Sequence, residues 1–190
     1  MLGIKSWFEG VPACAVARPG TCPCCKAAAQ PVGGRLVVVG HGLVERQVLG
    51  PQTAGGAAEA VVIKLRRYRC RACKAILVVG PRGLVPRRLY GAGAIALAFA
   101  AYGHGATSIA VRAQTSPTRV VGGSAAERWP TLVRWIEAAR RGKLFGVAGL
   151  GDLDRRNVTK QVTLVLAARG GHLLGGDLTQ SAFEGAMIAA

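Results

Sequence analysis

Six cysteines are the residues whose spacing in this chain points most specifically to a chemical role. Four of them form two C-x-x-C pairs, Cys22 with Cys25 and Cys70 with Cys73. Each pair can direct two thiolates at one ion, and four thiolates close the tetrahedral shell of a structural zinc site. We therefore predict one structural Zn²⁺ held by these four cysteines, with no open position for catalysis.

Two other residues compete for a place in this ligand set. Cys24 adjoins Cys25, and His41, in a Gly-His-Gly sequence, could replace one thiolate by a nitrogen ligand. The ordinary two-residue gap favours Cys22 with Cys25, and a histidine between glycines is more often a turn residue. The alternative to a metal site is a set of buried or redox-active cysteines.

The segment between the two pairs must be structured, because its 44 residues exceed the usual spacing of about 15 to 20. Residues rich in β-branched side chains predict strands at 35–39, 61–68 and 75–79. Strands that extend from two cysteine knuckles define a zinc ribbon, in which the metal replaces much of the core. We expect an N-terminal arm over 1–20 and the ribbon over 21–82.

Positive charge is concentrated in one part of the sequence. The chain has 25 lysines and arginines against nine acids, a net charge of +16, while the last forty residues carry four of each. Between Lys64 and Arg88 lie nine basic residues and no acid. Such an excess favours a polyanionic partner, because each neutralised phosphate releases condensed counterions, although a merely solvated charged face is the alternative. We expect nucleic-acid contacts from Lys64, Arg66, Arg67, Arg69, Arg71, Lys74, Arg87, Arg88, Arg112, Arg119, Arg128 and Arg134.

A membrane partner is not expected. The longest strongly apolar run, residues 92–101, is half of the roughly 20 residues that a membrane span requires. The N-terminus lacks the continuous apolar stretch of a secretory signal. These features predict a cytoplasmic, nucleoid-associated protein with reduced thiols.

Helical patterns follow the predicted ribbon. Helices are expected at 89–102, 106–114 and 129–141, and the tight turn between the first two suits a helix-turn-helix module over 83–145. The reading helix is either a short one opening near Arg119 or the helix at 129–141, which we prefer. Trp129 and Trp135 are expected in the core.

The last part of the chain, residues 146–190, is predicted to form a helical tail. Its helices are expected at 153–169, capped by Asp152 or Asp154, and at 178–189, capped by Asp177 or Thr179. Apolar residues on these helices would pack against the preceding module or pair two chains as a homodimer. The predicted fold class is therefore α+β, with a small ribbon of three or so antiparallel strands, a helix-turn-helix-like module and C-terminal helices.

Several motifs together resemble a known family. CPCC, GHGLVERQVLGP, RRYRCRAC, PRGLVPRRLYG, an alanine-rich helix and RWPTLVRW occur in that order over 22–145. This order is similar to that of zinc-ribbon, helix-turn-helix proteins of bacterial insertion elements, which are transposase-like or transposase-accessory. The resemblance implies the same four cysteine ligands and binding of element DNA. Lys26 stands where the family's knuckle commonly has glycine, a departure that could distort the turn.

No catalytic constellation is evident in the sequence. Asp152, Asp154, Asp177 and Glu184 lie on glycine-rich turns and a terminal helix with few polar neighbours, unlike a two-metal nuclease site. We therefore expect a zinc-dependent duplex-DNA-binding protein, with any chemistry supplied by a partner recombinase or transposase. The alternatives are a transcriptional or RNA-associated zinc-ribbon protein, an adaptor that bridges a recombinase to DNA, and a redox protein.

Overall fold

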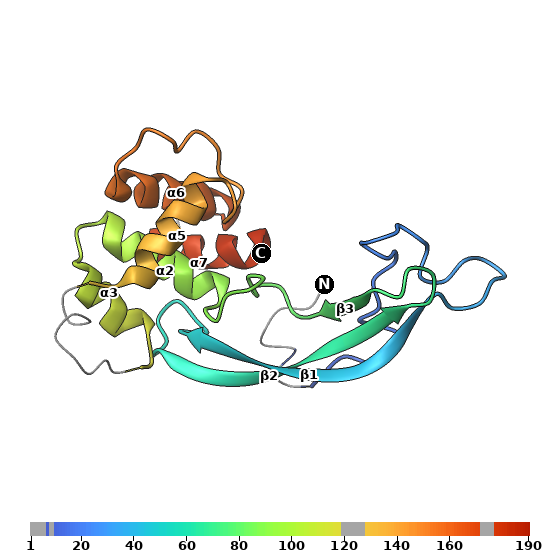
Figure 1. The fold of residues 1–190 in the computed structure, drawn as a ribbon. Helices are drawn as coiled ribbons and strands as arrows, with labels where there is room; N and C mark the ends of the chain where they lie inside the picture. The colour runs from blue at the N-terminus through green and yellow to red at the C-terminus, as the bar shows by residue number, and fades with distance from the viewer. Residues whose placement is uncertain (1–6, 8–9, 119–127, 172–176) are drawn as a thin grey trace. The chain divides into compact units, whose positions relative to one another are not determined.

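The structure is a computed structural model that describes residues 7, 10–118, 128–171 and 177–190. Its class is α+β: a three-stranded antiparallel sheet is followed, within the described residues, by five helices (Figure 1). The strands are β1 (Val38–Gly50), β2 (Glu59–Cys70) and β3 (Ile76–Val79). The helices are α2 (Ala92–Gly103), α3 (Ser108–Thr115), α5 (Pro130–Arg140), α6 (Arg155–Arg169) and α7 (Leu178–Ala189).

The chain forms two compact units, and neither is continuous in sequence. The first, called here the cysteine unit, comprises Met1–Gln47 and Val62–Pro81. The second, called the helical unit, comprises Val48–Val61 and Arg82–Ala190. The strands β1 and β2 each contribute residues to both units.

The sheet of the cysteine unit has β2 at its centre and β3 antiparallel to it, with Tyr68 opposite Leu77 and Arg69 opposite Ile76. Tyr68 and Leu77 are buried, whereas Arg69 and Ile76 are exposed, as expected for alternating sides of a strand. The buried cluster around the cysteine pairs is small, with the members Cys22, Ala29, Val38, Tyr68, Cys70 and Leu77, while Trp7, Ile63 and Leu65 are buried elsewhere in the unit. So small an apolar cluster gives little stability by itself.

The N-terminal segment is attached along β2 by hydrogen bonds. The Arg66 Nε donates to the Pro12 carbonyl over 2.8 Å, and the Tyr68 hydroxyl donates to the Cys14 carbonyl over 2.8 Å. Both side chains lie on one side of β2, because they are two residues apart on the strand. These bonds connect residues more than fifty positions apart and place the segment before the first cysteine pair beside the strand that leads to the second.

The strand predictions were correct for β2 and β3 and wrong for β1. The pattern predicted a strand at 35–39, but β1 runs from Val38 to Gly50 through the Gly-His-Gly sequence. Glycine is unfavourable in a strand, yet β1 needs glycine at positions 40 and 50, because side chains of other segments come too close there for a Cβ. A Cβ at Gly40 would lie 2.6 Å from the Cys14 Sγ, and one at Gly50 would lie 2.4 Å from the Ala94 Cβ.

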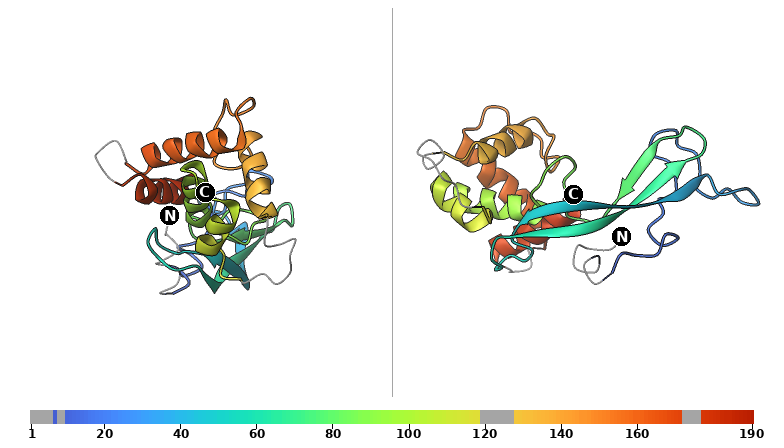
Figure 2. Two further views of the ribbon diagram at one scale, coloured as in Figure 1. Left: turned by 90° about the vertical axis from the view of Figure 1, so that its left-hand side faces the viewer. Right: turned by 60° about the horizontal axis from the view of Figure 1, so that its bottom comes forward.

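The helical unit is built around α2, a helix that is apolar on all sides. Nine of its twelve residues are buried, which is typical of a helix surrounded by others. The helices α3, α6 and α7 contact it, and α6 also packs closely along α7 (Figure 2). Trp129 and Trp135 are in the core, as predicted. None of the described helices is both long and apolar enough to span a membrane.

The predicted helices are confirmed, with shifts of a few residues at most ends. The third begins at Pro130, where a proline costs no hydrogen bond. Thr107 caps α3 through its side chain, and the alternatives left open for the tail are resolved in favour of Asp154 for α6 and Asp177 for α7. The acids Asp154 and Asp177 thus have structural roles as helix caps.

Replacing the α6 cap, Asp154→Ala, is expected to lower the melting temperature at neutral pH. The carboxylate accepts hydrogen bonds from the backbone N–H groups of Asn157 and Arg156, and these bonds hold the pKa of Asp154 below its usual value. A depressed folded-state pKa stabilises the protein above the unfolded pKa, and this contribution is lost as the pH falls through the folded pKa. Thermal unfolding from neutral to strongly acidic pH should show the gap between wild type and variant closing. Asp152→Ala, which removes an exposed acid two residues away, should show no such gap.

Candidate metal centre

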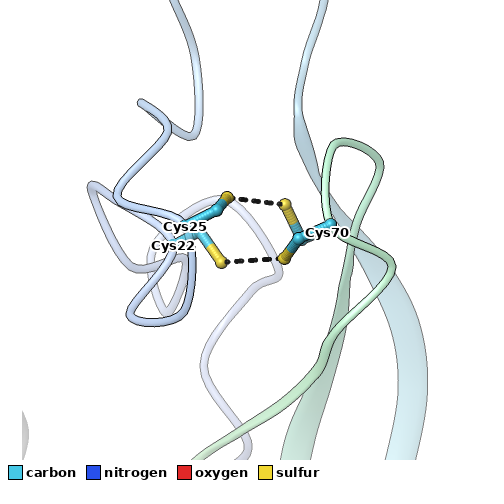
Figure 3. A group of neighbouring side chains, drawn as sticks. Cys22, Cys25 and Cys70 are labelled. Carbon is cyan, nitrogen blue, oxygen red and sulfur yellow. Dashed lines mark hydrogen bonds between the residues drawn. The ribbon is translucent and has the colours of Figure 1, made fainter.

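The two cysteine pairs meet, although 44 residues separate them in the sequence. The Cys22 and Cys73 sulfurs are 3.7 Å apart, the Cys25 and Cys70 sulfurs 3.8 Å, and all four lie within 4.8 Å of one another. Figure 3 shows Cys22 and Cys25 on one loop facing Cys70, with dashed lines between the sulfur pairs. A tetrahedron of thiolates bound to zinc at about 2.3 Å has edges of about 3.8 Å, so the four sulfurs can hold a metal ion.

Both pairs lie on turns with the same backbone hydrogen bonds. In the first turn the Cys22 N–H donates to the Ala27 carbonyl and the Lys26 N–H donates to the Cys22 carbonyl, over 2.9 and 2.8 Å. In the second the corresponding bonds run from Cys70 to Ala75 and from Lys74 to Cys70, both over 2.9 Å. We call these two turns the knuckles. Because the two knuckles have the same hydrogen bonds, each directs its two cysteine sulfurs toward the cluster in the same way.

A lysine follows the second cysteine of each knuckle and adopts a left-handed backbone conformation. The φ angles are 62° at Lys26 and 65° at Lys74, a region that favours glycine. The family resemblance raised the expectation that Lys26 could distort its turn. In the structure both knuckles carry lysine at this position and have equivalent hydrogen bonds.

Lys26→Gly is expected to stabilise the metal-loaded protein by up to about 1 kcal/mol. The left-handed conformation costs a residue with a Cβ about 1 to 2 kcal/mol, of which part is offset by the greater flexibility of glycine in the unfolded chain. Thermal unfolding with saturating metal measures the change. Lys26→Ala keeps the backbone strain and removes the same charge, so it should give no gain. If both variants are less stable than the wild type, the positive charge of Lys26 contributes more to stability than the backbone strain costs.

The thiols of the cluster differ in acidity. The backbone N–H of Cys25 donates to the Cys22 sulfur and, against the effect of burial, lowers the pKa of this thiol to about 7. At Cys73 the backbone N–H of Ala75 acts in the same direction, but burial and the neighbouring thiols outweigh it and raise the pKa to about 12. A metal ion among the sulfurs would favour the thiolate form of its ligands over the thiol form.

The remaining cysteines and the histidine considered as ligands lie outside this cluster. All six cysteines are free thiols. Cys24 is exposed, and His41 is exposed on β1; among the described residues the group able to hold a metal ion comprises Cys22, Cys25, Cys70 and Cys73. Four thiolates fill a tetrahedral shell, so the arrangement suits a structural ion.

The basic residues predicted to contact nucleic acid divide between the two units. Arg66 and Arg67 are half-buried, as are Arg88 and Arg112, and burial lowers the pKa of Arg88. Arg119 lies outside the described residues. The exposed members of the predicted set are Lys64, Arg69, Arg71 and Lys74 in the cysteine unit and Arg87, Arg128 and Arg134 in the helical unit.

The structure adds two arginines that the sequence analysis did not select. Arg155 and Arg156, at the start of α6, line a pocket together with Arg128 and Arg134. The sequence offers no signal for this grouping, because Arg128 and Arg134 lie just before and within α5, whereas Arg155 and Arg156 begin α6, about twenty residues further on. Only the packing of α6 beside α5 brings them together.

Comparisons with protein-family models, with curated proteins and with solved structures found no match.

Proposed function

We propose that this protein binds duplex DNA, with a zinc ribbon formed by the cysteine unit and a helix-turn-helix formed by α2 and α3. The ion proposed for the four cysteines is zinc, because four thiolates in a tetrahedral arrangement are the usual ligands of structural zinc. The small buried cluster of the cysteine unit supports this assignment, since binding of the ion would supply folding free energy that the apolar residues do not.

The observation that carries the proposal is the charge of the cysteine unit. Its two segments contain eleven lysines and arginines but only two glutamates. A zinc ion with four thiolates has a net charge of about −2, so it offsets only a small part of this excess. Lys64, Arg69, Arg71 and Lys74 are exposed and lie on or next to β2. The self-repulsion of so basic a unit is relieved when phosphates neutralise its charges.

The helix-turn-helix part of the proposal rests on the connection between α2 and α3. Four residues, 104–107, join the two helices, and Gly105 has a φ angle of 107°. A turn of three or four residues containing glycine is typical of this motif. Of the eight residues in α3, only Val111 and Thr115 are buried, so its exposed side, including Gln114, is available to read base edges. We therefore favour α3 as the reading helix over α5, whose Trp135 is in the core.

The association with a mobile element is a separate part of the proposal. It rests on the resemblance of the sequence to proteins of bacterial insertion elements, and it predicts a preference for element-end sequences. A preference over random duplex of less than about tenfold would leave general duplex binding as the function, because specific sites usually exceed that ratio by orders of magnitude.

Duplex binding is tested by fluorescence anisotropy with a labelled random duplex at KCl concentrations between about 50 and 200 mM. We expect the logarithm of the association constant to fall linearly with the logarithm of the salt concentration. The variant Arg69→Ala/Arg71→Ala should bind less tightly at every salt concentration and have a shallower slope. The control Arg141→Ala/Lys143→Ala removes two exposed charges after α5 and should bind like the wild type.

Two results would overturn the proposed function. One is the absence of duplex binding by the zinc-loaded protein even at the lowest salt concentration. The other is competition in which single-stranded RNA displaces the protein from the duplex at lower concentrations than unlabelled duplex does, which would favour the RNA-associated alternative.

A further inference from the structure

Two adjoining basic pockets lie at the N-terminal end of α5, within the helical unit. The first, of about 800 Å³, is lined on its basic side by Arg128, Arg134, Arg155 and Arg156. The second, of about 460 Å³, contains Arg112 as well as Arg128 and Arg134. Among the described residues that line either pocket there is no acid. Arg128 and Arg134 belong to both pockets and thus form their shared wall.

The second pocket also presents hydroxyl groups. The Tyr90 hydroxyl donates to the Ser116 Oγ over 2.8 Å, and the Ser116 Oγ lies 2.9 Å from the Thr118 Oγ1. Thr131, in the first turn of α5, lines the same pocket. Hydroxyl groups and arginines together are the usual partners of phosphate oxygens, to which both donate hydrogen bonds.

The wall of the two pockets is held in place by aromatic packing. Trp129, which precedes α5, lies edge-to-face against Tyr90 and Trp135, with ring centroids 5.9 and 5.1 Å away. Tyr90 in turn contacts Trp135 at 4.9 Å. Trp129 is only 4% exposed, so its position in the core is fixed, and Arg128 directly precedes it in the sequence. The start of α5 therefore does not have to be ordered when a ligand arrives.

One arginine of the first pocket is also positioned by its neighbours. The Arg156 guanidinium lies over the Tyr102 ring, 4.7 Å from its centroid, and its Nη1 donates to the Tyr102 carbonyl over 2.7 Å. These contacts use one face and one N–H of the guanidinium. The guanidinium has further N–H groups, so Arg156 can donate to an anion and keep its contacts with Tyr102 of α2.

We propose that the two pockets bind two successive phosphates of one DNA strand, with Arg128 and Arg134 between them. The lack of acids among the described lining residues, the number of arginines and the hydroxyl groups favour phosphate oxygens as the ligand. Two adjoining pockets that share Arg128 and Arg134 suit the regularly spaced phosphates of a DNA strand better than they suit one free phosphate ion. This inference rests on the proposed function, and it assigns to the helical unit a backbone contact separate from the charged surface of the cysteine unit.

The test compares Arg128→Ala/Arg134→Ala with the control Arg141→Ala/Lys143→Ala, which removes the same charge beyond the other end of α5. Binding to the labelled duplex is measured across the same salt series, and far-UV circular dichroism checks the fold of each variant. We expect the first variant to bind at least about tenfold more weakly, as is typical when a charge-assisted hydrogen bond is lost. Its salt slope should be smaller by about 1.8, which corresponds to two lost phosphate contacts.

The outcomes separate this inference from the proposed function. If the wild type binds duplex and the two double variants weaken binding equally, the pockets are not the phosphate site, while the proposed function stands. If the wild type does not bind duplex at all, the proposed function fails, and this inference fails with it. A third arm titrates inorganic phosphate into the DNA-free protein. Tight phosphate binding that Arg128→Ala/Arg134→Ala abolishes, and with which duplex does not compete, would overturn the inference in favour of a free anion as ligand.

Discussion

Purified wild-type protein is expected to contain about one zinc ion per chain, and Cys70→Ser should lose it. Cys70 is fully buried, its sulfur is 3.8 Å from that of Cys25, and it begins the second knuckle. Because loss of even an outer-shell partner weakens metal binding about 10- to 100-fold, loss of a ligand should weaken zinc binding more than about a hundredfold. Elemental analysis of the protein gives the stoichiometry, and competition with a chelator gives the affinity.

The consequence for the fold should be local to the cysteine unit. All helices described here belong to the helical unit, which has its own core, so the far-UV circular dichroism of Cys70→Ser should retain a helical signal. Amide resonances of the cysteine unit should lose dispersion. Cys24→Ser removes an exposed thiol two residues after Cys22 and should keep zinc, since Cys24 is outside the cluster. Equal zinc loss in both variants would contradict the ligand assignment.

Gly185→Ala should destabilise the helical unit by about 3 kcal/mol and lower its melting temperature by about 10 °C. A Cβ at Gly185 would lie 1.8 Å from the Leu166 carbonyl oxygen, and one at Gly170 would lie 1.9 Å from the Ser181 carbonyl oxygen. The two glycines thus allow α6 and α7 to approach at backbone distance. Because backbone atoms cannot move aside as a flexible side chain can, the helices must separate to admit a methyl group.

Thermal and chemical unfolding of the zinc-loaded protein measure this effect. Gly151→Ala is the matched control, because a Cβ at Gly151 would meet nothing within 4 Å and its φ angle is not in the left-handed region. The control should differ from wild type by less than about 0.5 kcal/mol. A change of that small size in Gly185→Ala would mean that α6 and α7 are not packed so closely in solution.

The sequence predicted the parts of this protein that depend on local rules. The two-residue gap in each C-x-x-C pair selected four thiols that the structure brings within 4.8 Å. The cap candidates of the tail included Asp154 and Asp177, which cap α6 and α7 in the structure, because a cap acts within one turn of the helix.

What the sequence did not predict depends on contacts between distant residues. β1 was missed because its glycines are unfavourable in a strand unless a neighbour needs the space, and that neighbour, the Cys14 thiol at Gly40, is 26 residues away. The arginines of the two pockets come from α3, α5, α6 and the residue before Trp129, and only helix packing gathers them.

The chain passes from one unit to the other three times, between residues 47 and 48, 61 and 62, and 81 and 82. A fragment that begins at Arg82 would therefore lack Val48 and Leu49, both buried, and the hydrogen bonds that Leu49 makes with Leu89 and Gly91. A fragment that ends at Pro81 would carry those same residues without their partners. A cut between Pro81 and Arg82 therefore separates residues of the helical unit from the residues that they hydrogen-bond. The helical unit can be transplanted only together with residues 48–61, which lie in the sequence between the two segments of the cysteine unit.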